Sequence, residues 1–212
     1  MSTYPLADDL FRMAHHRLHG RPLLHPRALS HGLAAALLAE LLYPQRIAVR
    51  RGLVVVGATV APPDDLVHGI LAQISAAPTP QPVKTWVGLL SETAVRQVAT
   101  RLARAGHVRR EVTRRRLVGR GERWVPTDMN TAGWPAVRLA TALRARRRLH
   151  VTDQGLAALT WACGLDRHIL NGAPPHAYDD LRTLVDHGWP PIVDLARQTR
   201  AALGRTVAAH RG

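Results

Sequence analysis

Several residue types and patterns are scarce in this 212-residue chain, and each scarcity excludes a class of protein. A single cysteine, Cys163, excludes an intrachain disulfide and a cysteine-based metal cluster, and indicates a reducing compartment. The longest apolar-rich run, GLAAALLAELLY, is far below the roughly 20 residues of a membrane-spanning helix, and it contains Glu40. The start, MSTYPLADDLFRMAHH, has acids where a secretory signal has a basic region. We therefore expect a soluble or peripheral cytoplasmic protein.

Catalytic and metal-binding motifs are also scarce. The sequence contains no G-x-S-x-G, P-loop, H-E-x-x-H or G-x-G-x-x-G. His15 and His19 have the i, i+4 spacing that can place two imidazoles on one ion, but no third ligand follows at matching spacing. We expect no metal, no cofactor, no catalytic residue and no cleft lined by converging carboxylates, so the protein is not expected to be an enzyme. Three acidic doublets are expected near helix starts, where the macrodipole favours carboxylates: Asp8-Asp9, Asp64-Asp65 and Asp179-Asp180.

Acidic residues are few relative to basic ones. The chain has 29 Lys and Arg against 15 Asp and Glu, which gives a formal net charge of +14. Such an excess implies attraction to polyanions, whether nucleic acid, an anionic membrane or an acidic partner. Seven arginines fall in HVRREVTRRRLVGRGERWVP, residues 107–126, which is predicted to form a basic hairpin.

Apolar residues at helical spacing are abundant, and they predict the fold class. The patterns indicate a first helix at about 5–18, apolar helical faces at 29–42, 66–74, 95–102 and 192–203, and a helix at about 153–163. RIAVRRGLVVVG reads as two short strands around Arg51-Gly52, and APP, PTPQP and NGAPPHAYDD read as loops. We expect a mainly α protein: a single helical-bundle domain over residues 1–212, with its core at about 6–207 and two small β-hairpins.

The basic hairpin has three possible uses. With the helix before it, it has the element order of a winged helix, in which Arg96, Arg101 and Arg104 lie off the apolar face and could meet DNA. Alternatively, the arginines meet anionic lipid headgroups, where each basic residue contributes about 1 kcal/mol. The third use is a solvated face that meets an acidic protein. Trp124 at the hairpin's end suits a membrane interface, or closes the hairpin onto the core.

The order of segments resembles the Golgi phosphoprotein 3 family, in its bacterial branch. The resemblance runs through GRPLLHPRALSHGLAAALLAELLYPQRIAVRRGLVVV, PPDDLVHGILAQI, PVKTWVGLLS, RLARAGHVRRE, VPTDMNTAGWPAVRLATALR and LTWACGLDRHIL. It implies a buried helix bundle ringed by amphipathic helices, with a projecting hairpin that contributes to self-association. Eukaryotic members bind phosphatidylinositol 4-phosphate on Golgi membranes, sort glycosyltransferases by their cytoplasmic tails, and are not enzymes.

The resemblance also implies a function and a site. It implies a peripheral membrane protein at the inner face of the cell membrane, with an anionic lipid, a second copy or a protein cargo as partner; nucleic acid is a partner only under the winged-helix alternative. The family's Trp and three Arg of the lipid site fall at His25, Ala34, and about Glu92 and Val95, so none keeps its type. The expected headgroup residues are Arg21, His25, Arg27 and Arg96, and the expected docking residues of the hairpin are Arg114, Arg115, Arg116, Arg120 and Trp124.

Overall fold

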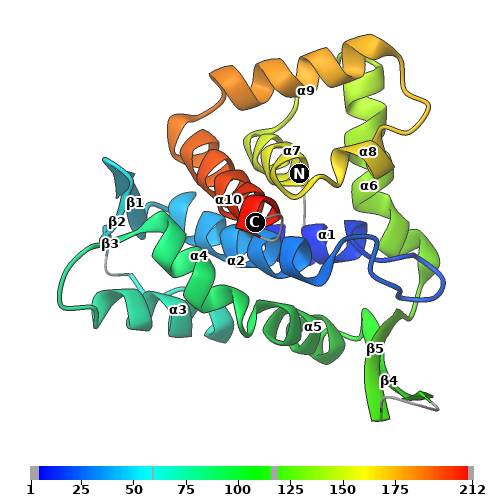
Figure 1. The fold of residues 1–212 in the computed structure, drawn as a ribbon, viewed down its shortest axis with the longest axis horizontal. Coiled ribbons are helices and arrows are strands. Elements are labelled where there is room, and N and C mark those ends of the chain that lie inside the picture. The colour runs from blue at the N-terminus through cyan, green and yellow to red at the C-terminus, as the bar shows by residue number, and fades with distance from the viewer. Residues whose placement is uncertain (1–4, 59, 116–118, 210–212) are drawn as a thin grey trace.

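The computed structural model describes residues 5–58, 60–115 and 119–209, and this part of the chain is mainly α-helical, which confirms the predicted fold class (Figure 1). It contains ten helices and two small antiparallel sheets. The helices are α1 (Leu6–Met13), α2 (Pro26–Leu42), α3 (Asp65–Ser75), α4 (Val83–Ser91), α5 (Ala94–Arg104), α6 (Met129–Arg144), α7 (Val151–Cys163), α8 (Asp166–Ile169), α9 (Pro175–His187) and α10 (Pro190–Ala209). The strands are β1 (Ile47–Arg50), β2 (Leu53–Val56), β3 (Gln81–Pro82), β4 (Val108–Arg115) and β5 (Gly119–Pro126).

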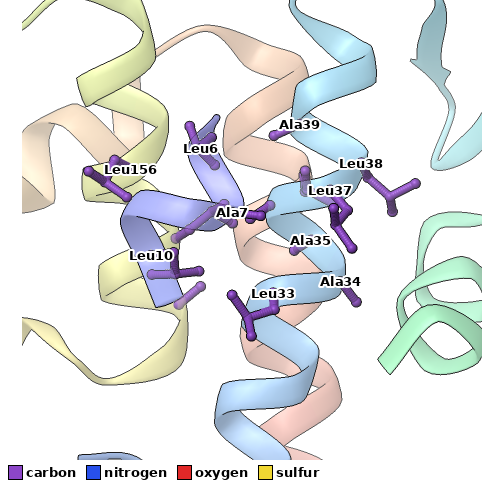
Figure 2. Packing of buried hydrophobic residues seen from close by; sticks show 14 of the residues in the cluster. Leu6, Ala7, Leu10, Leu33, Ala34, Ala35, Leu37, Leu38, Ala39 and Leu156 are labelled. Atoms are coloured by element: carbon purple, nitrogen blue, oxygen red, sulfur yellow. The ribbon is translucent and has the colours of Figure 1, made fainter. Parts of the chain in front are cut away.

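Helix α2 lies at the centre of the molecule, as Figure 1 shows. From Gly32 to Leu42 every residue except Glu40 is buried, so this helix is covered on all sides rather than along one stripe. Its alanines let neighbouring helices approach closely, and α1, α3, α4, α5, α7 and α10 all contact it. Figure 2 shows this packing, with apolar side chains of α1 and α7 gathered beside those of α2. A central buried helix ringed by others is the arrangement that the resemblance implied.

The first predicted helix is shorter than expected, because α1 ends at Met13 rather than near residue 18. The chain then turns back on itself, and His15 forms an isolated β-bridge with Pro22. Gly20 has a φ of +60°, and a Cβ at this position would overlap the carbonyl oxygen of Trp124. The loop of residues 14–25 therefore rests on the base of the β4–β5 hairpin, which brings two distant parts of the sequence together.

Other differences from the sequence prediction arise from proline. Helix α9 begins at Pro175 inside the stretch expected to be a loop, because proline is well tolerated at the first helical position. Helix α6 contains Gly133 and Pro135, two poor helix formers that hid its apolar periodicity. Gln81 and Pro82, also expected in a loop, pair with β2 as a third strand at the sheet edge.

Both predicted hairpins are present. Strands β1 and β2 pair antiparallel around Arg51 and Gly52, and β4 pairs with β5 from Val108↔Pro126 to Arg115↔Gly119. Trp124 is half-buried and packs against the core, so it closes the hairpin onto the helices. Among the helices that the structure describes, none combines the length and the hydropathy that crossing a bilayer requires.

Candidate functional site

A groove of about 1220 Å³ lies between the loop of residues 14–25, the start of α2, the start of α5 and strand β5. We call it the basic groove. Three separate stretches of the chain form its walls, residues 15–30, 91–96 and 122–124, and the contact between Gly20 and the hairpin base fixes two of them relative to each other. Its lining residues are His15, Gly20, Arg21, Pro22, Pro26, Arg27, Leu29, Ser30, Ser91, Glu92, Val95, Arg96, Glu122, Arg123 and Trp124.

Three of the four expected headgroup residues line this groove: Arg21, Arg27 and Arg96. Each of the three side chains is exposed, and within the described chain none of their guanidinium groups has a hydrogen-bond or ion-pair partner. His25 does not line the groove. Its Nδ1 instead accepts a hydrogen bond of 3.3 Å from the backbone N–H of Arg27, so it caps α2. The structure thus collects three unpaired cations that are up to 75 positions apart in the sequence (Arg21 to Arg96).

Two of the positions that match the family's lipid site also line the groove. Glu92 and Val95 lie on its wall beside Arg96, whereas Ala34 is fully buried inside α2. Arg123 adds a fourth arginine that the sequence analysis did not assign to this site, because only the hairpin register brings it to the groove. The arginines of the groove thus stand at other positions than the four that the resemblance matched to the family's site.

The start of α2 adds to the positive potential of the groove. Unsatisfied N–H groups at a helix start carry partial positive charge and favour anions. Burial, and secondly the positive charge of Arg27, lower the pKa of His31 in the next turn of α2. His15, which lies on the groove wall, is buried, and this burial lowers its pKa to about 4. It is therefore a neutral group at pH 7, with Nδ1 at 2.7 Å from the carbonyl oxygen of Phe11.

The hairpin arginines expected to dock on a membrane or on a second copy cannot be placed fully. Arg116 lies outside the described residues, and so do the side chains of Arg114, Arg115 and Arg120. The backbone register pairs Arg114 with Arg120. Their docking role stays a prediction.

The two histidines with metal-like spacing do not share a helix face, because α1 ends before them. His15 stacks on Phe11 with ring centroids 4.0 Å apart, and His19 stacks on His16 at 4.9 Å. In residues 5–58, 60–115 and 119–209, no group of three or more His, Cys, Asp or Glu is arranged to hold a metal ion.

Buried charges form a second cluster, which the sequence analysis missed. We call it the ion-pair hub, and its members are Asp8, Asp9, Arg12, Glu40, Asp64, Arg101, Arg138 and Asp153. Arg101 is only 12% exposed, and its guanidinium donates to Asp8 at 2.8 Å and to Glu40 at 2.9 Å. This arginine was expected to face DNA in the winged-helix alternative, and that expectation is wrong. The sequence did hold one signal of this buried cluster: Glu40 lies in an otherwise apolar run, and a buried carboxylate needs a partner.

The hub also corrects the interpretation of the acidic doublets. Asp64 does cap α3, since its Oδ1 accepts a 3.0 Å hydrogen bond from Val67 N–H. Asp8 and Asp9 do lie in the first turn of α1, as expected, but they are also buried in the hub, where Asp9 is 2.6 Å from Arg12 and 2.9 Å from Arg138. The third doublet, Asp179-Asp180, falls inside α9 and away from its start.

A pocket of about 330 Å³ opens beside the hub, and Asp9, Glu40, Asp64 and Asp153 line part of it. The sequence analysis expected no cleft lined by converging carboxylates, so this finding corrects it. Every one of these carboxylates contacts Arg12, Arg101 or Arg138. Burial raises the pKa of Glu40 against the opposing effect of Arg101. Because guanidinium groups already engage all four, the arrangement is that of structural ion pairs.

The described chain is thus a helical bundle with two small hairpins and an open groove lined by four arginines. The family model for Golgi phosphoprotein 3 (GPP34) matches residues 6–203, nearly the whole chain. The chain therefore belongs to the Golgi phosphoprotein 3 family, as the resemblance indicated. No curated protein matches the sequence.

Proposed function

We propose that this chain is a non-enzymatic peripheral membrane protein that binds anionic lipid headgroups in the basic groove. The observation that carries the proposal is the convergence of Arg21, Arg27 and Arg96, all unpaired within the described chain, on one open groove. Membership of the family supports phosphatidylinositol 4-phosphate as the headgroup. The location that follows is the inner face of the cell membrane, in the cytoplasm.

The physical chemistry of the groove suits a phosphate. Guanidinium groups bind phosphate oxygens through two parallel hydrogen bonds, which gives both affinity and orientation. The start of α2 offers further attraction to an anion through the positive end of its helix dipole. Trp124, half-buried at the groove edge, presents an amphipathic ring of the kind enriched at membrane interfaces.

The test is co-sedimentation of the full chain with vesicles of neutral phosphatidylcholine, alone or with phosphatidylglycerol or phosphatidylinositol 4-phosphate. The variant Arg21→Glu/Arg27→Glu reverses two charges of the groove. The control variant Arg50→Glu/Arg167→Glu makes the same change in net charge at two exposed arginines outside the groove. We expect the groove variant to bind anionic vesicles at least about tenfold more weakly, since each cation near the surface contributes about 1 kcal/mol.

Three results would contradict the proposal. One is equal binding of the wild-type protein to neutral and anionic vesicles, and another is the same loss of binding in both variants. Tight, sequence-specific binding to duplex DNA at matched salt would favour the winged-helix alternative. That alternative now lacks Arg101, which lies in the hub.

The hairpin is proposed as the surface for self-association, and protein cargo as a further partner. Sedimentation-equilibrium measurements of the wild-type protein and of Arg114→Glu/Arg120→Glu test the first point. We expect the variant to remain folded, with its oligomer shifted toward monomer; an unchanged oligomer would place the contact elsewhere.

A further inference from the structure

A second concave basic surface lies at the other end of α6, far from the basic groove. We call it the α6–α9 hollow; it has a volume of about 600 Å³. Its lining residues are Leu143, Arg146, Arg147, Arg148, Leu149, Gln154, Asp180, Thr183, Leu184, His187 and Gly188. Three consecutive arginines thus face one hollow, with Asp180 as the acidic residue of its lining.

The backbone that carries these arginines is held rigidly. Helix α6 ends in a turn in which Arg146 N–H donates to Leu143 O at 3.3 Å and Arg147 N–H donates to Ala142 O at 2.9 Å. Arg146 occupies the left-handed position of this turn with a φ of +50°, where glycine is the usual residue. The side chains of Arg146 and Arg147 therefore leave the chain from a hydrogen-bonded turn.

The arginines of the hollow are poorly neutralised. The carboxylate of Asp180 lies 3.8 Å from Nε of Arg146, which is long for an ion pair, and both side chains are exposed. Within the part of the chain that the structure describes, no hydrogen bond or ion pair engages the guanidinium groups of Arg147 and Arg148. Arg144, in the last turn of α6, is engaged elsewhere, because its guanidinium donates to Asn171 O at 2.9 Å.

We propose that the α6–α9 hollow is a second anion site, which binds a phosphate-bearing ligand through Arg147 and Arg148. Guanidinium groups match phosphate geometry, and Leu143, Leu149 and Leu184 provide an apolar wall for the rest of a phosphate ester. Helix α6 has 16 residues and is about 24 Å long, so the two sites are well separated. Figure 1 shows the hairpin at one end of α6 and α9 at the other. One molecule can therefore hold two phosphate groups at once.

The experiment compares the wild-type protein with Arg147→Glu/Arg148→Glu, which leaves Arg146 and its turn intact. Glycerol phosphate is titrated into ¹⁵N-labelled protein, and affinity at the hollow is read from the amides of residues 143–150 and 180–188. We expect at least about tenfold weaker binding in this variant, a change of about 1.4 kcal/mol. Arg50→Glu/Arg167→Glu, with the same net charge, is expected to change affinity by less than about twofold.

A second measurement separates the two sources of phosphate. If the hollow takes a lipid headgroup, wild-type protein aggregates phosphatidylglycerol vesicles in dynamic light scattering, and Arg147→Glu/Arg148→Glu binds vesicles without aggregating them. If the hollow binds a soluble phosphate ester instead, glycerol phosphate shifts the amide resonances, and the vesicles do not aggregate. Absent amide shifts in the wild-type protein, or an equal loss in the control variant, would overturn the proposal. The basic groove is tested separately, because Arg21→Glu/Arg27→Glu leaves the hollow unchanged.

Discussion

The ion-pair hub and the basic groove use the same residue type for opposite purposes. In the hub, Arg101 is 12% exposed and its guanidinium meets carboxylates from α1, α2 and the start of α3. In the groove, Arg21, Arg27 and Arg96 are exposed, and their guanidinium groups have no partner in the described chain. A buried guanidinium holds helices together, whereas an exposed one is available to a ligand.

The difference shows that local sequence does not distinguish an arginine of a buried ion pair from an exposed one. Arg96 and Arg101 lie on the same helix, five positions apart, and both fall outside its apolar pattern. What separates them is whether a carboxylate from another helix lies opposite. Asp8 and Glu40 lie opposite Arg101, while the side of α5 that carries Arg96 faces the open groove.

The largest expected effect comes from breaking the hub. Replacing Arg101 by Ala leaves Asp8 and Glu40 buried without their main partner, so we expect the free energy of unfolding to fall by about 3–5 kcal/mol. Urea denaturation followed by circular dichroism measures this. Arg104→Ala, one turn away and exposed, is the control, with an expected loss of at most about 1 kcal/mol. Equal losses in the two variants would mean that the hub contributes nothing specific.

A smaller effect is expected from His15, the buried titratable group on the groove wall. Burial lowers its pKa to about 4 in the folded protein, against 6.5 for an unperturbed histidine. Between these two values the unfolded chain binds a proton that the folded protein does not, so stability is fully present above pH 6.5 and falls as the pH decreases toward 4. The expected loss is about 3 kcal/mol.

Urea denaturation at several pH values checks this contribution. His15→Gln is expected to flatten the dependence of stability on pH between 4 and 6.5, whereas the exposed His68→Gln is expected to leave the wild-type slope. An unchanged slope in His15→Gln would show that other groups produce the acid sensitivity.

The smallest expected effect on stability comes from salt, which should act differently on the exposed groove and on the buried hub. Raising NaCl from 0.1 M to 1 M shortens the screening length from about 10 Å to about 3 Å. We expect vesicle binding through the exposed groove to be lost. The thermal midpoint should change little, because the inner members of the hub, Asp8, Asp9 and Arg12, are buried, and buried ion pairs are screened much less than exposed ones. A midpoint that falls with salt in the wild-type protein but not in Arg101→Ala would contradict this account of the hub.

Much of the fold could be predicted because it follows from local patterns. Leucines at helical spacing indicated α2. The turn signal Arg51-Gly52 and the glycine-bearing stretch within residues 107–126 indicated both antiparallel pairs. The length of α1 could not be predicted, because the chain leaves the helix at Met13 to place Gly20 against the hairpin base. That contact joins residues more than a hundred positions apart, and no local propensity encodes it.

The candidate site was predicted in part. Arg21, Arg27 and Arg96 were identified as neighbours of the family's positions, and the structure places all three on one groove. His25 was assigned to the same role, yet its ring caps α2. Arg123 was overlooked, since only the register of β4 and β5 sets which hairpin arginine turns to the groove.

The sequence alone determined the helical class, the net positive charge and the family of this protein, because apolar periodicity, residue counts and segment order are properties of the chain itself. Only the tertiary structure decided which charges are paired. Pairing depends on distances between segments that are remote in the sequence, and on burial, which makes Glu40 require Arg101 but leaves Arg27 free of partners in the described chain. The division of arginines between buried ion pairs and the open groove is therefore a property of the fold.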